Sequence, residues 1–166
     1  MIQKKVCMLG TFAVGKTSLV SQFVSSLFSE KYLSTVGVKV DKKVMTVGKQ
    51  NVTLVLWDLY GEDGLQTVQK SYLRGASGYL LVVDGTRYET FAAVRDLQKL
   101  AASVVGAAPF VLALNKADLA SEWKIDEKSL IAVAEQGWTI VRTSAKTGQG
   151  VEDAFDMLAR AMLEAS

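Results

Sequence analysis

The chain has 166 residues, of which 49% are apolar, and its 19 basic and 17 acidic side chains leave a formal net charge of +2. It contains one cysteine and no histidine, which excludes a Ser-His-Asp or Cys-His site, a histidine-bound zinc and an intrachain disulfide. The charge lacks the bias of a dedicated nucleic-acid binder, and the apolar runs are far shorter than the ~20 residues that span a bilayer. We therefore expect a single cytoplasmic domain over residues 1–166, with no nucleic acid among its partners.

Short apolar runs alternate along the chain with segments of helical periodicity. The predicted strands are Val6 to Leu9, Val38 to Val47, Val52 to Trp57, Tyr79 to Val83, Phe110 to Leu114 and Trp138 to Arg142. The predicted helices start near Gly15, Phe91, Asp126 and Val151. The short turn Gly48 to Asn51 makes the second and third strands antiparallel, whereas the other connections suit helical crossovers. This pattern predicts an α/β three-layer sandwich: a mostly parallel six-stranded sheet with one antiparallel edge strand and helices on both faces.

The first motif lies where the first strand passes into the first helix and reads Gly10-Thr11-Phe12-Ala13-Val14-Gly15-Lys16-Thr17. It fits the P-loop pattern GxxxxGK[ST], in which backbone N–H groups and the helix N-terminus converge on phosphate oxygens. Lys16 is expected to reach the β and γ phosphates, and the Thr17 hydroxyl to coordinate Mg²⁺. The predicted phosphate-binding residues are Ala13, Val14, Gly15, Lys16, Thr17 and Ser18. A chance glycine-rich turn is the alternative interpretation.

The second motif, Trp57-Asp58-Leu59-Tyr60-Gly61, follows another strand of the predicted sheet. An acidic residue at a strand end beside a P-loop can anchor a metal-bound water, so Asp58 is expected to hold Mg²⁺. Gly61 would offer its N–H to the γ-phosphate. A simple capping or turn role for Asp58 is the alternative.

Two further motifs follow later strands: Asn115-Lys116-Ala117-Asp118 and Thr143-Ser144-Ala145-Lys146. A single carboxylate can accept hydrogen bonds from both guanine N1–H and the 2-amino group, a donor pair that adenine lacks, so Asp118 is expected to select guanine. The Lys116 stem can lie over the ring, and the Ala145 N–H can bind guanine O6. Each string alone is weak, but all four motifs fall at carboxyl ends of predicted strands, where open α/β sheets bind ligands. The predicted base-binding residues are Asn115, Lys116, Asp118, Ser144, Ala145 and Lys146.

Taken together, the motifs make the chain similar to small GTPases of the Ras superfamily, most of all to Rab-type members and to a prokaryotic type without a lipid anchor. The resemblance covers essentially the whole chain and implies a Ras-like P-loop NTPase fold with GTP or GDP and Mg²⁺ as ligands. It assigns Thr35 to Mg²⁺ and the γ-phosphate, and Phe28 to edge-on stacking against guanine. It also places Trp57 and Tyr72 where Rab-type proteins present an apolar surface to effectors, although ordinary packing of these aromatics is equally compatible.

Departures from the family pattern concern hydrolysis and anchoring. Glu62 stands where the family's glutamine orients the attacking water, and its carboxylate would repel the γ-phosphate. We therefore expect slow hydrolysis, with Lys16, Thr35, Gly61 and Glu62 as the catalytic set. Since no cysteine lies near the C-terminus and Ile2 follows Met1, no direct lipid anchor is expected; the chain is either an unanchored protein or a domain trimmed from a longer one.

The function expected from these observations is a guanine-nucleotide switch. GTP would hold the loops near Thr35 and Gly61 in order, and effectors, exchange factors and GTPase-activating proteins would read or change that state. The alternative is a nearly non-hydrolysing GTP-binding scaffold, or a regulatory domain of the Roc type in a larger assembly. An adenine-specific ATPase would leave Asp118 unexplained.

Overall fold

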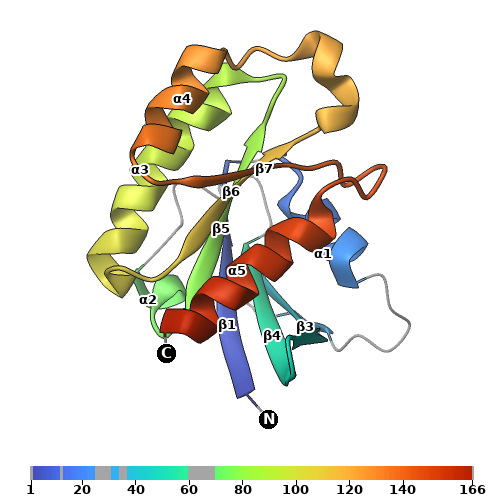
Figure 1. The fold of residues 1–166 in the computed structure, drawn as a ribbon, viewed down its shortest axis with the longest axis vertical. Coiled ribbons are helices and arrows are strands. Elements are labelled where there is room, and N and C mark those ends of the chain that lie inside the picture. Colours follow the sequence, from blue (N-terminus) through green and yellow to red (C-terminus); the bar gives the residue numbers. More distant parts are fainter. Residues whose placement is uncertain (1, 12, 25–30, 34–36, 60–69, 166) are drawn as a thin grey trace.

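The computed structural model describes residues 2–11, 13–24, 31–33, 37–59 and 70–165 (Figure 1). Among these residues the strands form one sheet in the order β2-β3-β4-β1-β5-β6-β7. The strands are β1 (Ile2–Leu9), β2 (Lys31–Leu33), β3 (Val38–Val47), β4 (Gln50–Leu59), β5 (Gly78–Asp84), β6 (Phe110–Asn115) and β7 (Thr139–Arg142). The helices are α1 (Lys16–Val24), α2 (Lys70–Leu73), α3 (Tyr88–Val105), α4 (Glu127–Glu135) and α5 (Val151–Ala165), with a 3₁₀ helix, η1, over Ala117–Glu122.

All six predicted strands form, and the predicted mixture of pairings is confirmed. β1 pairs in parallel with β4 and β5, β5 with β6, and β6 with β7, whereas β3 is antiparallel to β4. The three residues of β2 add a strand that sequence analysis did not identify, antiparallel to β3 and outside it. Three residues are too few to show alternation, and the pairing is supplied by the main chain of β3.

The helices cover both faces of the sheet, as predicted. α1 and α5 pack on one face, where the rings of Phe23 and Phe155 stack with their centroids 4.0 Å apart. On the other face lie α2, α3 and α4, whose apolar side chains pack around Tyr79 and Leu112 (Figure 1). No helix in the described part of the chain combines the length and apolar character needed to cross a bilayer.

All four predicted helices form, although α3 begins at Tyr88, three residues before the predicted start near Phe91. Asp126 caps α4, since its carboxylate accepts a hydrogen bond from the Ser129 N–H at 3.1 Å. Gly106 ends α3 with a φ of +61°, a conformation in which a side chain is strained. Cys7 is fully buried in β1, and burial raises the pKa of its thiol to about 12.

The sheet brings the four motifs together at the carboxyl ends of its parallel strands. In the register of the central strands, Met8 of β1 lies beside Asp58 of β4, and Asp84 of β5 lies beside Asn115 of β6. The segment after β7 joins this edge through the Thr143 N–H, which donates to the Leu114 carbonyl at 2.8 Å. The carboxyl ends of the parallel strands therefore form a common site.

Candidate functional site

The loop between β1 and α1 contains two residues whose backbone lies in the left-handed region. Ala13 and Gly15 have positive φ values of 63° and 101°. A Cβ at Gly15 would lie 2.3 Å from Asn115 Nδ2, and one at Gly10 would lie 2.7 Å from the Val82 carbonyl oxygen. The loop is therefore packed so tightly against β5 and β6 that both positions require glycine.

Lys16, the first residue of α1, crosses back over this loop. Its side chain is 8% exposed, and Nζ donates to the carbonyl oxygens of Gly10 at 2.8 Å and Thr11 at 3.3 Å. Burial lowers the pKa of its ammonium, an effect that nearby Asp58 opposes. The fold thus holds a buried cation against the carbonyl oxygens of this loop.

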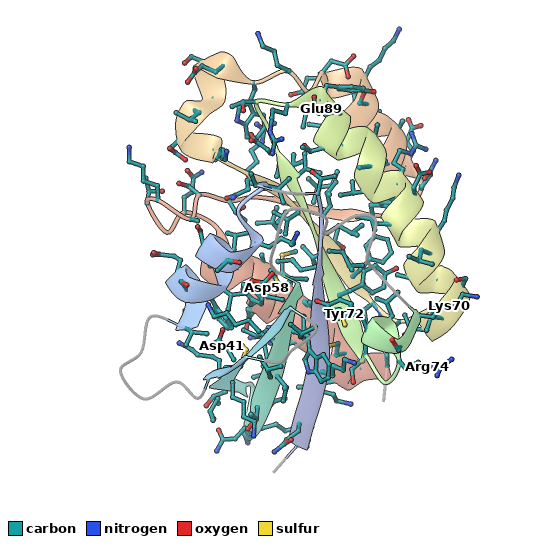
Figure 2. The ribbon with its side chains drawn as sticks, turned by 180° about the vertical axis from the view of Figure 1, so that it is seen from behind. Asp41, Asp58, Lys70, Tyr72, Arg74 and Glu89 are labelled. Carbon is teal, nitrogen blue, oxygen red and sulfur yellow. The ribbon has the colours of Figure 1, made fainter. Side chains whose placement is uncertain are left out.

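Asp58 lies at the end of β4 with no solvent exposure (Figure 2). Its Oδ2 accepts a hydrogen bond from Thr17 Oγ1 at 2.5 Å, whereas its Oδ1 has no hydrogen-bond partner among the described residues. Burial raises the pKa of this carboxyl, although the Thr17 hydrogen bond and Lys16 pull in the opposite direction. A buried, unsatisfied carboxylate oxygen next to a hydroxyl is a donor set that suits Mg²⁺, so these residues fit the expected metal.

Asp41 of β3 is a second buried carboxylate that sequence analysis missed. It is 1% exposed, and neither carboxylate oxygen has a hydrogen-bond partner in the described part of the chain. Lys39 Nζ lies 3.7 Å from its Oδ2 and, in the register of β3 with β4, Lys39 is directly opposite Asp58. Asp41 and Asp58 therefore share one face of the sheet, close to α1 (Figure 2). Embedded in a lysine-rich strand, Asp41 carries no local sign of burial.

Asn115 joins the base motif to the phosphate loop. Its Nδ2 donates to the Val14 carbonyl at 2.9 Å, and its Oδ1 accepts from Thr143 Oγ1 at 3.2 Å and from the Ala145 N–H at 3.3 Å. The Ala145 N–H expected to bind guanine O6 thus faces Asn115 in this structure. One buried amide connects β6, the P-loop and the segment after β7.

Asp118 and Ser144 pair at the outer end of the same site. Ser144 is fully buried and its Oγ donates to Asp118 Oδ1 at 2.8 Å while accepting from the Thr147 N–H at 3.1 Å. Asp118 itself is exposed. The carboxylate is therefore fixed through one oxygen while its side chain remains open to solvent.

A pocket of about 420 Å³ lies between the P-loop and the two base motifs, a size typical of small-molecule sites. Its lining residues are Gly15, Ser18, Asn115, Lys116, Asp118, Leu119, Ala145 and Lys146. Of these, only Leu119 was not anticipated, because an apolar residue after the fourth motif position reads as packing. The structure thus brings the described base-motif residues and part of the P-loop around one space.

Lys116 adopts a left-handed backbone conformation, with φ +69° and ψ +38°. Its ammonium lies 2.8 Å from Asp84 Oδ2, and its carbonyl accepts from Trp123 Nε1 at 2.9 Å. Asp84 is 1% exposed; although burial alone would raise the pKa of its carboxyl, hydrogen bonds from Lys116, Thr86 and Arg87 lower that pKa to about 2. Sequence analysis missed both Asp84 and Trp123, although an acidic residue ending a buried strand is the signal that identified Asp58.

Several predicted site residues lie outside the described residues, namely Phe28, Thr35, Gly61 and Glu62. Of the two aromatics assigned to an effector surface, Tyr72 is only 6% exposed, and its hydroxyl donates to the carbonyl oxygens of Met8 and Trp57. This favours the packing interpretation for Tyr72. Trp57 is half-buried, and Lys5 Nζ lies 3.7 Å from the centroid of its ring.

Comparison with known proteins shows that the amino-acid sequence is similar to the Ras family and to individual Rab proteins. The sequence profile described as the Ras family matches residues 5–164. The chain is 32% identical to the Ras-related protein Rab-13 of Canis lupus familiaris over 96% of the chain and 79% of that protein. It is 35% identical both to RABC2a of Arabidopsis thaliana and to Rab-4A of Homo sapiens, again over 96% of the chain and over 78% and 74% of those proteins.

Proposed function

Because this chain belongs to the Ras family, whose members are GTP-binding switch proteins, we propose that it binds GTP and GDP with Mg²⁺. It does so as one G domain and hydrolyses GTP slowly. The observation that carries the proposal is Asn115, whose side chain hydrogen-bonds both the P-loop and the segment after β7. This contact, together with a pocket lined by residues of both the P-loop and the base motifs, supports the recognition of phosphate and base at adjoining positions.

At the phosphate end, the P-loop from Ala13 to Ser18 wraps the β-phosphate with backbone N–H groups at the start of α1. Lys16, now held by two loop carbonyls, is positioned to exchange those contacts for phosphate oxygens. Thr17 and Asp58 would hold Mg²⁺, with Thr35 as the third expected ligand. When bound, Mg²⁺ neutralises the charge that develops on the phosphates.

At the base end, Asp118 accepts hydrogen bonds from guanine N1–H and the 2-amino group. The Ser144 hydroxyl donates to Oδ1 of Asp118, so the orientation of the carboxylate is set before the nucleotide arrives. The Lys116 stem covers one face of the ring, and Phe28 is assigned to its edge. Lys146 closes the exposed side of the pocket, which it already lines.

Hydrolysis in this scheme depends on positioning and charge neutralisation. Gly61 and Thr35 contact the γ-phosphate and transmit its presence to the loops that carry them, where effectors, exchange factors and GTPase-activating proteins bind. Glu62 replaces the neutral amide that would orient water with a carboxylate, and its charge slows the reaction. The single cysteine favours a reducing, cytoplasmic setting.

The direct test is to identify the nucleotide that copurifies with the protein and to follow single-turnover conversion of loaded GTP. Slow conversion to GDP, accelerated in Glu62→Gln, supports the proposal. Persistent GTP that Glu62→Gln does not convert faster would instead identify the nearly non-hydrolysing scaffold. An adenine nucleotide in the pocket would contradict both.

A further inference from the structure

Asp84 has no part in the nucleotide contacts proposed above, yet it is one of the most fully hydrogen-bonded side chains near the pocket. It ends β5, beside Asn115 in the register with β6. Its Oδ1 accepts from the Thr86 N–H at 2.9 Å and from Thr86 Oγ1 at 2.7 Å. Its Oδ2 lies 2.8 Å from Lys116 Nζ and 3.0 Å from Arg87 Nε. A buried carboxylate that is this well paired remains ionised and holds its cations firmly.

The backbone of Lys116 is held from the same side. A left-handed residue other than glycine is strained and persists only where its surroundings fix it. Here the indole N–H of Trp123 donates to the Lys116 carbonyl at 2.9 Å. The Trp123 ring in turn packs so closely on Gly85 that a Cβ there would lie 2.4 Å from Trp123 Cε2, and the Gly85 carbonyl accepts from the Lys124 N–H at 2.8 Å.

The last residue of β5 and the glycine that follows it therefore hold both ends of Lys116. Asp84 fixes the ammonium, and Gly85 gives Trp123 the space from which it fixes the carbonyl. Lys116, held at these two anchors, is one of the residues that line the pocket. A lysine stem ordered in advance loses less conformational entropy when a ring binds against it.

We propose that Asp84 is a positioning residue for nucleotide binding, which acts through Lys116 by holding its stem in place against the purine ring. The inference rests on the proposed function, because it assumes that the ring lies over Lys116. Since stacking on a stem does not distinguish purine substituents, Asp84 governs how long a nucleotide is retained and Asp118 governs which base is chosen.

A double-mutant cycle on Asp84 and Lys116 tests this role. The variants are Asp84→Asn, Lys116→Met and the two together, and the measurement is the release rate of fluorescent GDP from the loaded protein. Only molecules that hold nucleotide contribute to this rate, so a partly unfolded preparation does not distort it. We expect Asp84→Asn to speed release about tenfold, the effect of one charge-assisted hydrogen bond, and the double variant to release GDP no faster than Lys116→Met.

Arg87→Gln is the matched control, because Arg87 binds the same oxygen of Asp84 but has no contact with Lys116 among the described contacts. We expect it to change the release rate less than about twofold. If the effects of Asp84→Asn and Lys116→Met multiply in the double variant, Asp84 acts independently of Lys116 and the inference is overturned.

A second readout separates this inference from the proposed function. Inosine diphosphate lacks the 2-amino group, so the ratio of its release rate to that of GDP reports on Asp118. Asp84→Asn should accelerate both releases by the same factor; a change in their ratio would contradict the positioning role. Failure of the wild-type chain to bind GDP would overturn the proposed function and this inference with it.

Discussion

The base end and the phosphate end of the candidate site differ in how completely their polar groups are paired. At the base end, Asn115, Asp84 and Ser144 are buried and each has at least two hydrogen bonds. At the phosphate end, Asp58 and Asp41 are equally buried, yet three of their four carboxylate oxygens have no hydrogen-bond partner among the described residues.

This difference has a physical consequence for each end. A satisfied buried network stabilises the fold and fixes geometry, so the base end is built before any ligand binds. Unsatisfied buried charge lowers stability, so the phosphate end is less stable without a cation and is stabilised when a cation binds. The candidate site thus combines a base end that is rigid without ligand and a phosphate end whose stability depends on the ligand.

The largest expected effect comes from breaking the junction between the ends. Gly15→Ala would place a Cβ 2.3 Å from Asn115 Nδ2 at a φ of +101°, and strain of about 3 kcal/mol corresponds to a loss of GDP affinity on the order of a hundredfold. Titration with fluorescent GDP measures it. Gly48→Ala is the control: its φ is +62° with no atom within 4 Å of the added Cβ, so it should leave affinity unchanged.

Stability should fall when the base end loses a charge. Asp84→Asn removes an ionised carboxylate that faces two cations, and we expect a cost of about 3 kcal/mol at neutral pH. Because the folded pKa of Asp84 is about 2 and the unfolded value is about 3.9, this contribution is present above about pH 4 and is lost as the pH falls toward 2. Urea denaturation of both proteins across that range measures the difference; a constant difference would contradict the assignment.

At the phosphate end, removing a carboxylate charge is expected to raise the free energy of unfolding and not to lower it. Burial raises the pKa of Asp58, so ionising this carboxyl in the folded protein costs stability. The protein is therefore most stable below the pKa of Asp58 in the unfolded chain, and its stability decreases as the pH rises through the folded pKa. In nucleotide-free protein, Asp58→Asn should therefore raise the free energy of unfolding at neutral pH by about 1 kcal/mol. The same variant should lose most of the thermal stabilisation that GDP with Mg²⁺ gives the wild type.

Thermal unfolding with and without chelator measures both effects of Asp58→Asn. The control is Asp126→Asn, where the side chain is exposed and Asn caps a helix as well as Asp does. Destabilisation of the nucleotide-free Asp58→Asn protein would show that the two ends do not differ in the way described.

The smallest effect is expected at Asp41, whose carboxylate lies on the same face of the sheet as Asp58 with Lys39 between them. Removing this negative charge leaves Lys39 uncompensated near the metal ligands, so Asp41→Asn should weaken Mg²⁺ binding to the GDP complex a few-fold. Magnesium titration of GDP release measures the change. Unchanged Mg²⁺ affinity would show that Asp41 belongs to the core and not to the site.

Sequence analysis captured the elements whose signal is local. The strand–loop–helix context of the P-loop motif and the strand-end position of Asp58 each depend on a few adjacent residues, and both are found in the structure. Asp41 was missed because the flanking lysine-rich sequence does not encode which face of the sheet its side chain occupies. Asp84 follows a predicted strand as Asp58 does, but only the folded sheet shows its ion pair with Lys116. β2 escaped for a related reason, because its pairing comes from β3.

The roles of individual residues also exceeded what the motifs could say. The string around Asn115 identified a base motif, but only the packed structure shows its amide hydrogen-bonded to the Val14 carbonyl of the P-loop. The burial of Tyr72 likewise follows from α2 packing on the sheet, which its sequence neighbours do not reveal.

The central claim is that this pocket selects guanine through Asp118, and one measurement tests it most directly. Binding of GDP and xanthosine diphosphate is compared between the wild type and Asp118→Asn, whose new amide can donate to the 2-oxo group of xanthine. We expect the wild type to prefer GDP and Asp118→Asn to prefer xanthosine diphosphate. Retained preference for GDP in Asp118→Asn would contradict it.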